Sequence, residues 1–322
     1  MIVATQFQTG AAAGVEVDIQ SCSEILEDPA SLLWVSVVGH DSDDLKIIEE
    51  EFAIHYLAIE AAGRTSARPE IDFYDNFIYI NFYAFDRDDG LETELHMISF
   101  FVGPNFLVTV QDRPIRSLGE INTNWIQSTR ESGQHGVGLL LYSVLDPIVD
   151  DYFLIVDAYA NEIDAIETEI FEGNSPESLQ RLFDIKKRAM EFRRVLAPER
   201  DLLNTLLRWD SPLLDRQTII YLQDVYDHLL RVVDSIDNYR DLLGTVLDAH
   251  LSLTSNRLNQ TMKTLTASSI ILMGMTLVAS IYGMNFERMP ELSWNLGYWF
   301  ALGLMTLIGT GLVVVFRRID WI

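Results

Sequence analysis

Two uncharged stretches near the end of the chain carry the residues whose types and spacing could handle a metal ion. No Asp, Glu, Lys or Arg occurs from 264 to 286 or from 292 to 316, and each stretch reaches the roughly 20 residues that cross about 30 Å of hydrocarbon. Alternate steps of three and four residues from Asp248 trace a seam of small, polar or thioether side chains that continues into the first stretch. This seam contains Asp248, Ser252, Ser255, Asn259, Met262, Thr266, Ser269, Met273, Thr276 and Ser280.

A polar seam on a membrane helix has two interpretations. It can line a narrow polar conduit where identical helices surround an axis, or its small residues can simply allow close helix packing. Asn259, together with Asn285 beyond the end of the stretch, favours the conduit. Met262 and Met273 are candidates for a hydrophobic constriction; because Met is an ordinary packing residue, only their place in the seam supports this.

A short motif follows the first stretch. The sequence reads Tyr282-Gly283-Met284-Asn285, then Met289-Pro290-Glu291-Leu292, the second uncharged stretch and a short basic end. This order resembles the CorA family of divalent-cation channels, whose signature is Gly-Met-Asn at the outer end of the first span. The segments Asp224-Val225-Tyr226-Asp227-His228, Asp150-Asp151-Tyr152-Phe153 and Arg68-Pro69 extend the likeness over nearly the whole chain.

The resemblance implies a fold and an ion pathway. The fold would be an α/β cytoplasmic domain plus long helices that continue into two transmembrane helices per subunit, in a funnel-shaped homopentamer. Mg²⁺ would be both the transported and the regulatory ion. Carboxamide and carbonyl oxygens suit its transport, because they can accept hydrogen bonds from its bound water. The implied selectivity filter is Gly283, Met284 and Asn285, and the implied pore-lining residues are Asp248, Asn259, Met262, Thr266, Ser269, Met273, Thr276 and Ser280.

The resemblance also implies a regulatory site, in which Mg²⁺ bound by carboxylates between neighbouring cytoplasmic domains favours the closed pentamer. The family has a further acidic residue where this chain has Ala61, so one ligand is missing and Asp72 or Asp75 could replace it. Taken singly, each carboxylate is more often a solvated surface group than a ligand. The matching positions are Asp224, Asp146 and Glu60.

Three smaller features bear on the pore. Gly274 stands where the family commonly has proline, so we expect a helix that bends without being forced to kink. Gly283 is expected to let the chain leave the helix, because glycine tolerates left-handed backbone. The end of the chain, 317–322, carries Arg317 and Arg318 in place of a longer lysine run, which thins the expected basic collar.

Composition limits partners and location. With 48 acidic and 23 basic residues the formal charge is −25, which argues against nucleic acid as a partner and suits the attraction of cations. Cys22 is the only cysteine, so neither an internal disulfide nor a thiolate cluster is expected. Residues 1–45 lack Lys and Arg, and Arg257, Lys263, Arg317 and Arg318 flank the spans. We therefore expect a multi-pass protein of the cell (inner) membrane with both termini cytoplasmic.

The elements that must position these residues can be predicted in outline. Strands are expected at 32–38, 77–85, 95–102 and 106–111, the last three consecutive and antiparallel, with a helix over 43–62. Long helices are expected over 138–173, 176–208 and 215–283. The predicted division is 1–135 N-terminal α/β domain, 136–212 helical hairpin, 213–263 cytoplasmic part of the pore helix, 264–283 first transmembrane helix, 284–297 extracytoplasmic loop, 298–316 second transmembrane helix and 317–322 basic tail.

Three hypotheses about function follow. The first is a passive Mg²⁺ channel, driven by membrane potential and closed by cytoplasmic Mg²⁺, that also passes Co²⁺ or Ni²⁺. The second is a family member for Zn²⁺ or another transition metal, although no His or Cys occurs after 250. The third is a membrane-anchored oligomeric scaffold, which would leave Asn285 unexplained. No catalytic motif or phosphate-binding loop is found, so neither an enzyme nor a prosthetic group is expected.

Overall fold

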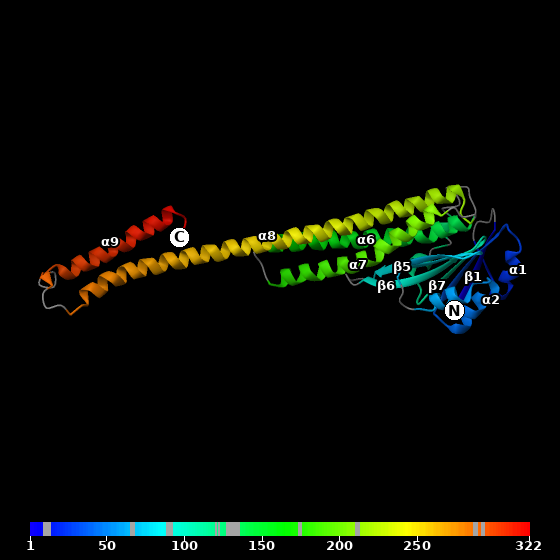
Figure 1. The fold of residues 1–322 in the computed structure, drawn as a ribbon, viewed down its shortest axis with the longest axis horizontal. Coiled ribbons are helices and arrows are strands. Elements are labelled where there is room, and N and C mark those ends of the chain that lie inside the picture. Colours follow the sequence, from blue (N-terminus) through cyan, green and yellow to red (C-terminus); the bar gives the residue numbers. More distant parts are fainter. Residues whose placement is uncertain are drawn as a thin grey trace. The chain divides into compact units, whose positions relative to one another are not determined.

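The structure is a computed structural model whose chain divides into two compact units. The units are Met1–Gly244 and Thr245–Ile322, and helix α8 (Arg216–Tyr282) contributes to both (Figure 1). The structure describes residues 1–8, 14–64, 68–87, 93–119, 121, 123–126, 136–172, 176–209, 213–285, 289–290 and 294–322. The segment 284–297, predicted as the extracytoplasmic loop, is therefore described only in part.

The first unit contains a seven-stranded sheet in the order β2-β1-β3-β7-β6-β5-β4. Strands β3 and β7 are parallel, and the other neighbouring pairs are antiparallel. The four predicted strands are confirmed, whereas β1, β2 and β4 at the two sides of the sheet were not predicted. The strands are β1 Ile2–Gln8, β2 Val15–Val17, β3 Ser31–Val38, β4 Glu70–Phe73, β5 Ile78–Arg87, β6 Thr93–Val102 and β7 Phe106–Gln111.

Helices cover both faces of this sheet, with α2 on one side and α6 and α7 on the other (Figure 1). Leu45 and Ile48 of α2 (Ser42–Glu51) pack in one core with Val35, Val37 and Phe101. Burial on both faces explains why the central strands read as continuous apolar runs. The short helical segments are η1 Ile19–Ser21, α1 Cys22–Leu26 and α4 Arg116–Gly119.

The single helix predicted over 43–62 is wrong. The structure has two helices, α2 and α3 (Tyr56–Ala62), separated at Ala53, whose φ is +50°. The residues on either side, Phe52 and Ile54, are 5% and 4% exposed. Burial of both side chains therefore accompanies the left-handed backbone at Ala53, which costs a non-glycine residue about 1–2 kcal/mol.

Three long helices complete the first unit: α6 (Val137–Glu172), α7 (Pro176–Arg208) and the first part of α8. Arginines of α7 join them, because Arg188 Nη2 lies 2.8 Å from Glu162 Oε2 on α6 and Arg193 Nε lies 2.5 Å from Asp237 Oδ1 on α8. Gly138 allows α6 to approach α8, since an added Cβ would lie 2.2 Å from Thr218 Cγ2.

The second unit consists of the rest of α8 and helix α9 (Gly297–Arg318). Both helices are long and apolar enough to cross a membrane, and little of either apolar window is buried inside the chain. The two helices pack through small residues: Ala267 and Ala301 are buried, and an added Cβ at Gly274 would lie 3.3 Å from Ile308 Cγ2. Small side chains of this kind let membrane helices approach closely.

Candidate ion pathway and metal centre

The predicted seam lies on the free face of α8. Its eight predicted pore-lining residues are all solvent-exposed in the single chain. At about 100° of rotation per residue, Thr276 lies about 180° and Ser269 about 160° around the helix from Ala267, which is buried. The part of the seam around Ser269 and Thr276 therefore points away from the face that packs against α9. Among the residues that the structure describes, the hydroxyl groups of Ser269 and Thr276 bond to carbonyls of α8 and not to α9.

Hydroxyl groups on this face present acceptors to whatever lies opposite. Ser269 Oγ donates to the Leu265 carbonyl at 2.9 Å, and Thr276 Oγ1 donates to the Leu272 carbonyl at 2.8 Å. Each hydroxyl has one proton, which these bonds use, and retains lone pairs. An oxygen with free lone pairs is suited to accept a hydrogen bond from the water around a cation.

The Gly-Met-Asn motif follows directly on the end of α8. The Gly283 N–H bonds to the Ala279 carbonyl at 3.0 Å and the Ser280 carbonyl at 3.2 Å, and the Met284 N–H bonds to the Ile281 carbonyl at 3.3 Å. Asn285 is exposed just beyond these bonds. The negative end of the helix dipole and its terminal carbonyls therefore face the segment that carries the carboxamide, which favours a cation there.

The chain leaves helix α8 at Gly283, as predicted, but not through left-handed backbone. Gly283 is not among the described residues with positive φ, so the helix ends through tightened hydrogen bonds rather than through a left-handed glycine. The bendability expected of the helix at Gly274 stays a prediction, and in the structure this glycine lies against Ile308 and Leu312 of α9. The absence of a side chain at 274 thus serves helix packing.

At the other end of the seam, Asn259, Met262 and Thr266 line a surface hollow together with Trp321. The end of the chain is held there, because Thr264 Oγ1 lies 3.3 Å from the Trp321 carbonyl oxygen and the Trp321 ring stacks on Phe316 with centroids 5.7 Å apart. Polar and apolar seam residues therefore meet where α8 passes the end of α9.

A second candidate site lies in the first unit, between α6 and α8. Asp146, Asp150 and His228 each offer one ligand atom, and these atoms lie within 4.8 Å of one another. Asp224 adjoins them, with Oδ1 3.7 Å from His228 Nε2, while His228 Nδ1 lies 3.3 Å from Asp150 Oδ1. Each helix contributes a pair spaced by four residues, so both pairs face the same space.

The electrostatics of this cluster favour a bound cation. Burial and the nearby Asp150 raise the pKa of Asp146 to about 6, whereas His228 and a hydrogen bond from Tyr142 act in the opposite direction. His228 Nδ1 is buried and makes no hydrogen bond with any residue that the structure describes. Carboxylates that repel one another beside an imidazole nitrogen with no hydrogen bond are an arrangement that a divalent ion stabilises.

Sequence reasoning identified part of this cluster. Asp146 and Asp224 lie in it, but Glu60 does not, and it pairs with Arg64 at 3.1 Å. The predicted role of Glu60 across a subunit boundary stays a prediction. Asp150 and His228 were missed, although their positions four residues after Asp146 and Asp224 place them on the same helix faces.

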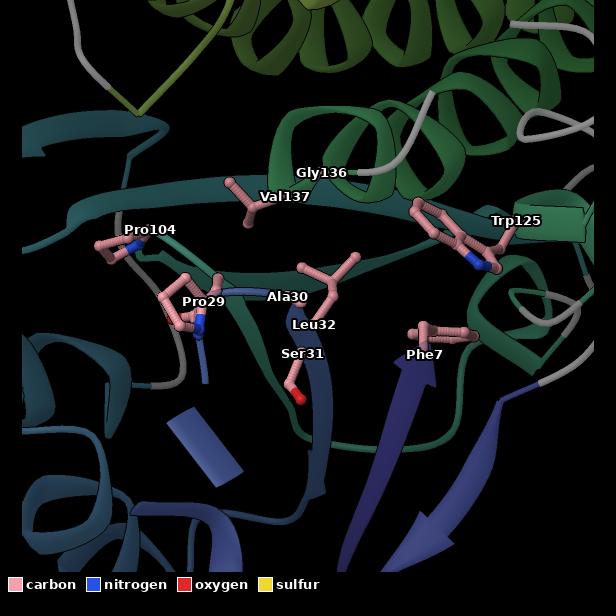
Figure 2. Close-up of a pocket in the computed structure, with 10 residues that line it drawn as sticks. Phe7, Pro29, Ala30, Ser31, Leu32, Pro104, Trp125, Gly136 and Val137 are labelled. Atoms are coloured by element: carbon pink, nitrogen blue, oxygen red, sulfur yellow. The ribbon is translucent and has the colours of Figure 1, made fainter. Parts of the chain in front are cut away.

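A cavity of about 120 Å³ in the first unit is a poorer candidate for a cation. Figure 2 shows Phe7, Trp125 and two prolines around it. Its polar groups already have partners: Ser31 Oγ bonds to Asp28 and Gln6, and Asn105 Nδ2 bonds to the Leu26 carbonyl. It is lined by neither a carboxylate nor an imidazole among the residues that the structure describes.

Comparison with known proteins gives a consistent result. The sequence profile described as "CorA-like Mg2+ transporter protein" matches residues 29–318. The cobalt/magnesium transport protein CorA of Thermotoga maritima is 34% identical over 303 residues, covering 92% of this chain and 85% of that protein. Its counterpart in Methanocaldococcus jannaschii is 25% identical over 302 residues, covering 93% and 94%.

A solved structure has the same fold. The complete structure of the CorA magnesium transporter from Methanocaldococcus jannaschii matches with a TM-score of 0.82 at 24% sequence identity. The match covers 100% of this chain and 99% of that one. The soluble α/β domain, the long helix and the second apolar helix are therefore all parts of one known fold.

Proposed function

This chain belongs to the CorA-like family of Mg²⁺ transporters, and from that premise we propose that it is a membrane channel for divalent cations, Mg²⁺ foremost. Relatives named as cobalt/magnesium transport proteins support this function. The observation that carries it is the exposed polar seam of α8, which points away from α9. Burying such a face in lipid is costly, whereas lining a water-filled path is not.

The proposed channel is a homopentamer in the cell membrane with both termini in the cytoplasm. Five copies of α8 would place their seams around one axis and their Asn285 residues in one ring at the outer mouth. Mg²⁺ loses its hydration water reluctantly, so neutral carboxamide and carbonyl oxygens would hold the hydrated ion weakly enough to release it. Met262 and Met273 would close the path by excluding water.

Membrane potential is sufficient to drive this transport. A divalent cation gains about 4.6 kcal/mol on crossing 100 mV of inside-negative potential, twice the value for one charge. Feedback would come from the cluster of Asp146, Asp150, Asp224 and His228, since a cation that binds one conformation better increases its population. Helix α8 carries both Asp224 and the seam, so it would connect the two sites.

The test is ion uptake into proteoliposomes that hold the purified protein. Mg²⁺ and Zn²⁺ uptake are compared at imposed inside-negative potentials and at several internal Mg²⁺ concentrations. We expect potential-driven Mg²⁺ uptake that falls as internal Mg²⁺ rises. Zn²⁺ uptake without Mg²⁺ uptake would replace this proposal with a transition-metal transporter, and no uptake of either ion would support a scaffold.

Asn285→Ala tests the proposed filter in the same experiment. Removing the carboxamide from the outer ring should abolish flux while the oligomer stays intact, as judged by size-exclusion chromatography with light scattering. Flux that persists unchanged in Asn285→Ala would remove this residue from the filter.

A further inference from the structure

Glu199 is a fully buried carboxyl group that the proposed channel function does not use. It lies on α7, with 0% of its surface exposed. Glu199 Oε1 accepts a hydrogen bond of 2.7 Å from the Tyr83 N–H of β5, and Glu199 Oε2 lies 3.2 Å from the Tyr152 hydroxyl of α6. That hydroxyl also donates to the Tyr83 carbonyl. The backbone N–H and carbonyl of one β5 residue, Tyr83, are therefore bonded by two side chains from two helices.

These contacts take the place of a neighbouring strand. The pairing of β4 with β5 ends at Glu70 opposite Asn81, and Pro69, which precedes Glu70, has no N–H to extend it. Tyr83 thus lies beyond the last residue pair of β4 and β5, and its N–H and carbonyl bond to side chains instead. Glu199 and Tyr152 satisfy both groups, so they join α6 and α7 to the sheet at this point.

The number of protons fixes the charge of this group. The Tyr83 carbonyl can only accept, and the single proton of Tyr152 is donated to it. The contact between Tyr152 and Glu199 Oε2 then requires a proton on Glu199. An ionised Glu199 would compete for the proton of Tyr152 and leave either a carbonyl or a carboxylate oxygen unpaired in a buried site, which is costly.

The surroundings agree with a neutral carboxyl. Burial raises the pKa of Glu199 well above its ordinary value, whereas its contacts with Tyr83 and Tyr152 act in the opposite direction. Charged groups of the surrounding elements have bonds of their own among the described residues. They are Asp151 of α6 with Ser117, Arg200 of α7 with Asp201, Glu70 of β4 with Asn81, and Asp237 of α8 with Arg193.

We propose that Glu199 is a proton-binding site: it carries a proton at neutral pH and closes an uncharged ring of hydrogen bonds with Tyr83 and Tyr152 that fastens α7 to the uncovered edge of β5. The ring runs from the Tyr83 N–H to Glu199, from the Glu199 hydroxyl to Tyr152, and from Tyr152 to the Tyr83 carbonyl. Every buried donor and acceptor in it is used without a buried charge.

The proposal fixes the sign of a pH dependence. The unfolded chain loses this proton near the ordinary Glu pKa of about 4.3, whereas the folded chain keeps it to a higher pH. Above about pH 4.3 the folded state therefore binds more protons, so stability falls as pH rises. This group alone lowers the folded-to-unfolded ratio about tenfold per pH unit until the folded protein also loses the proton.

Glu199→Gln tests the proposal, because the amide has the shape and the donor of a neutral carboxyl group. Thermal unfolding of the full-length protein in detergent is followed between pH 5 and 8. We expect Glu199→Gln to fold, to be at least as stable as wild type at pH 7.5, and to lose the tenfold-per-unit contribution. Glu191→Gln is the control, since this exposed residue of the same helix pairs with Lys187.

Infrared spectroscopy supplies an independent readout. The wild type minus Glu199→Gln difference spectrum at neutral pH should contain the carbonyl band of a protonated carboxyl group, and the difference with Glu191→Gln should not. Three results would each overturn the proposal: a carboxylate band in place of the carboxyl band, a pH dependence of stability that Glu199→Gln leaves unchanged, or a Glu199→Gln protein that fails to fold. The last counts because a neutral amide of the same shape should be accepted if the native group is neutral.

Discussion

At the scale of single residues, the direction of a proton decides what a side chain offers to a ligand. Ser269 and Thr276 use their protons on carbonyls of their own helix, so they present lone pairs outward. His228 has a buried Nδ1 without a hydrogen bond, 3.3 Å from Asp150. The first arrangement suits a hydrated cation in transit, and the second suits a cation held directly.

The imidazole of His228 makes a testable difference between metals. His228→Ala should weaken binding of Ni²⁺ or Co²⁺ to the purified protein by at least about tenfold, and binding of Mg²⁺ less, because nitrogen ligands suit the later transition metals. Isothermal titration calorimetry measures both. The control is Asp227→Asn, since Asp227 is adjacent in sequence but bonds to Gln223. Equal losses for Ni²⁺ and Mg²⁺ would contradict direct ligation by nitrogen.

At the scale of elements, glycines set how closely helices pack. Gly274→Leu should destabilise the pair α8–α9 by about 1–3 kcal/mol, the usual cost of overpacking, because the first added atom already lies 3.3 Å from Ile308. Thermal unfolding in detergent measures this. Gly303→Leu on α9 is the control, because an added Cβ there meets nothing within 4 Å. If both variants unfold alike, packing at 274 is unimportant.

A second glycine, Gly138, sets the distance between the two helices that carry the metal cluster. Gly138→Ala should push α6 from α8, because its Cβ would lie 2.2 Å from the buried Thr218 side chain. We expect lower stability and weaker Ni²⁺ binding, since α6 carries Asp146 and Asp150. Gly244→Ala is the control: its Cβ meets nothing within 4 Å, and alanine should gain up to about 1 kcal/mol of helix stability. Undiminished metal binding in Gly138→Ala would show that the cluster tolerates a wider helix separation.

The elements themselves were largely predictable. Apolar periodicity located α6, α7 and α8, and the absence of charge located α9, because helices of this length leave a strong pattern. The break between α2 and α3 was not predictable, since the positive φ of Ala53 accompanies the burial of Phe52 and Ile54 by the rest of the domain, which is a tertiary feature. Strand β2 was missed because its three residues are too few for an alternating pattern.

The candidate sites also differ in how far the sequence predicts them. The seam was predictable because one helical period fixes which residues share a face. The cluster was only half predictable. The pairs Asp146–Asp150 and Asp224–His228 are each visible within one helix, but the contact between α6 and α8 that joins them is tertiary. The ring around Glu199 was out of reach, because it joins residues 116 positions apart.

At the scale of the whole molecule, the central claim is that the face of α8 turned from α9 lines the path of the ion. Two adjacent serines lie on different faces of α8 and so allow this claim to be tested. Ser268 and Ser269 are both exposed, and each bonds to a carbonyl four residues back. They differ by about 100° around the helix, so only Ser269 belongs to the seam.

The most direct measurement is therefore Mg²⁺ uptake into proteoliposomes by Ser269→Cys and Ser268→Cys, each in a Cys22→Ala background, before and after treatment with a small cationic thiol reagent. Cys22 is the only native cysteine, so the reagent has a single target in each protein. If the ion passes along this face, the reagent should block uptake by Ser269→Cys and leave uptake by Ser268→Cys largely unchanged. Block at Ser268→Cys alone, or equal block in both, would contradict it.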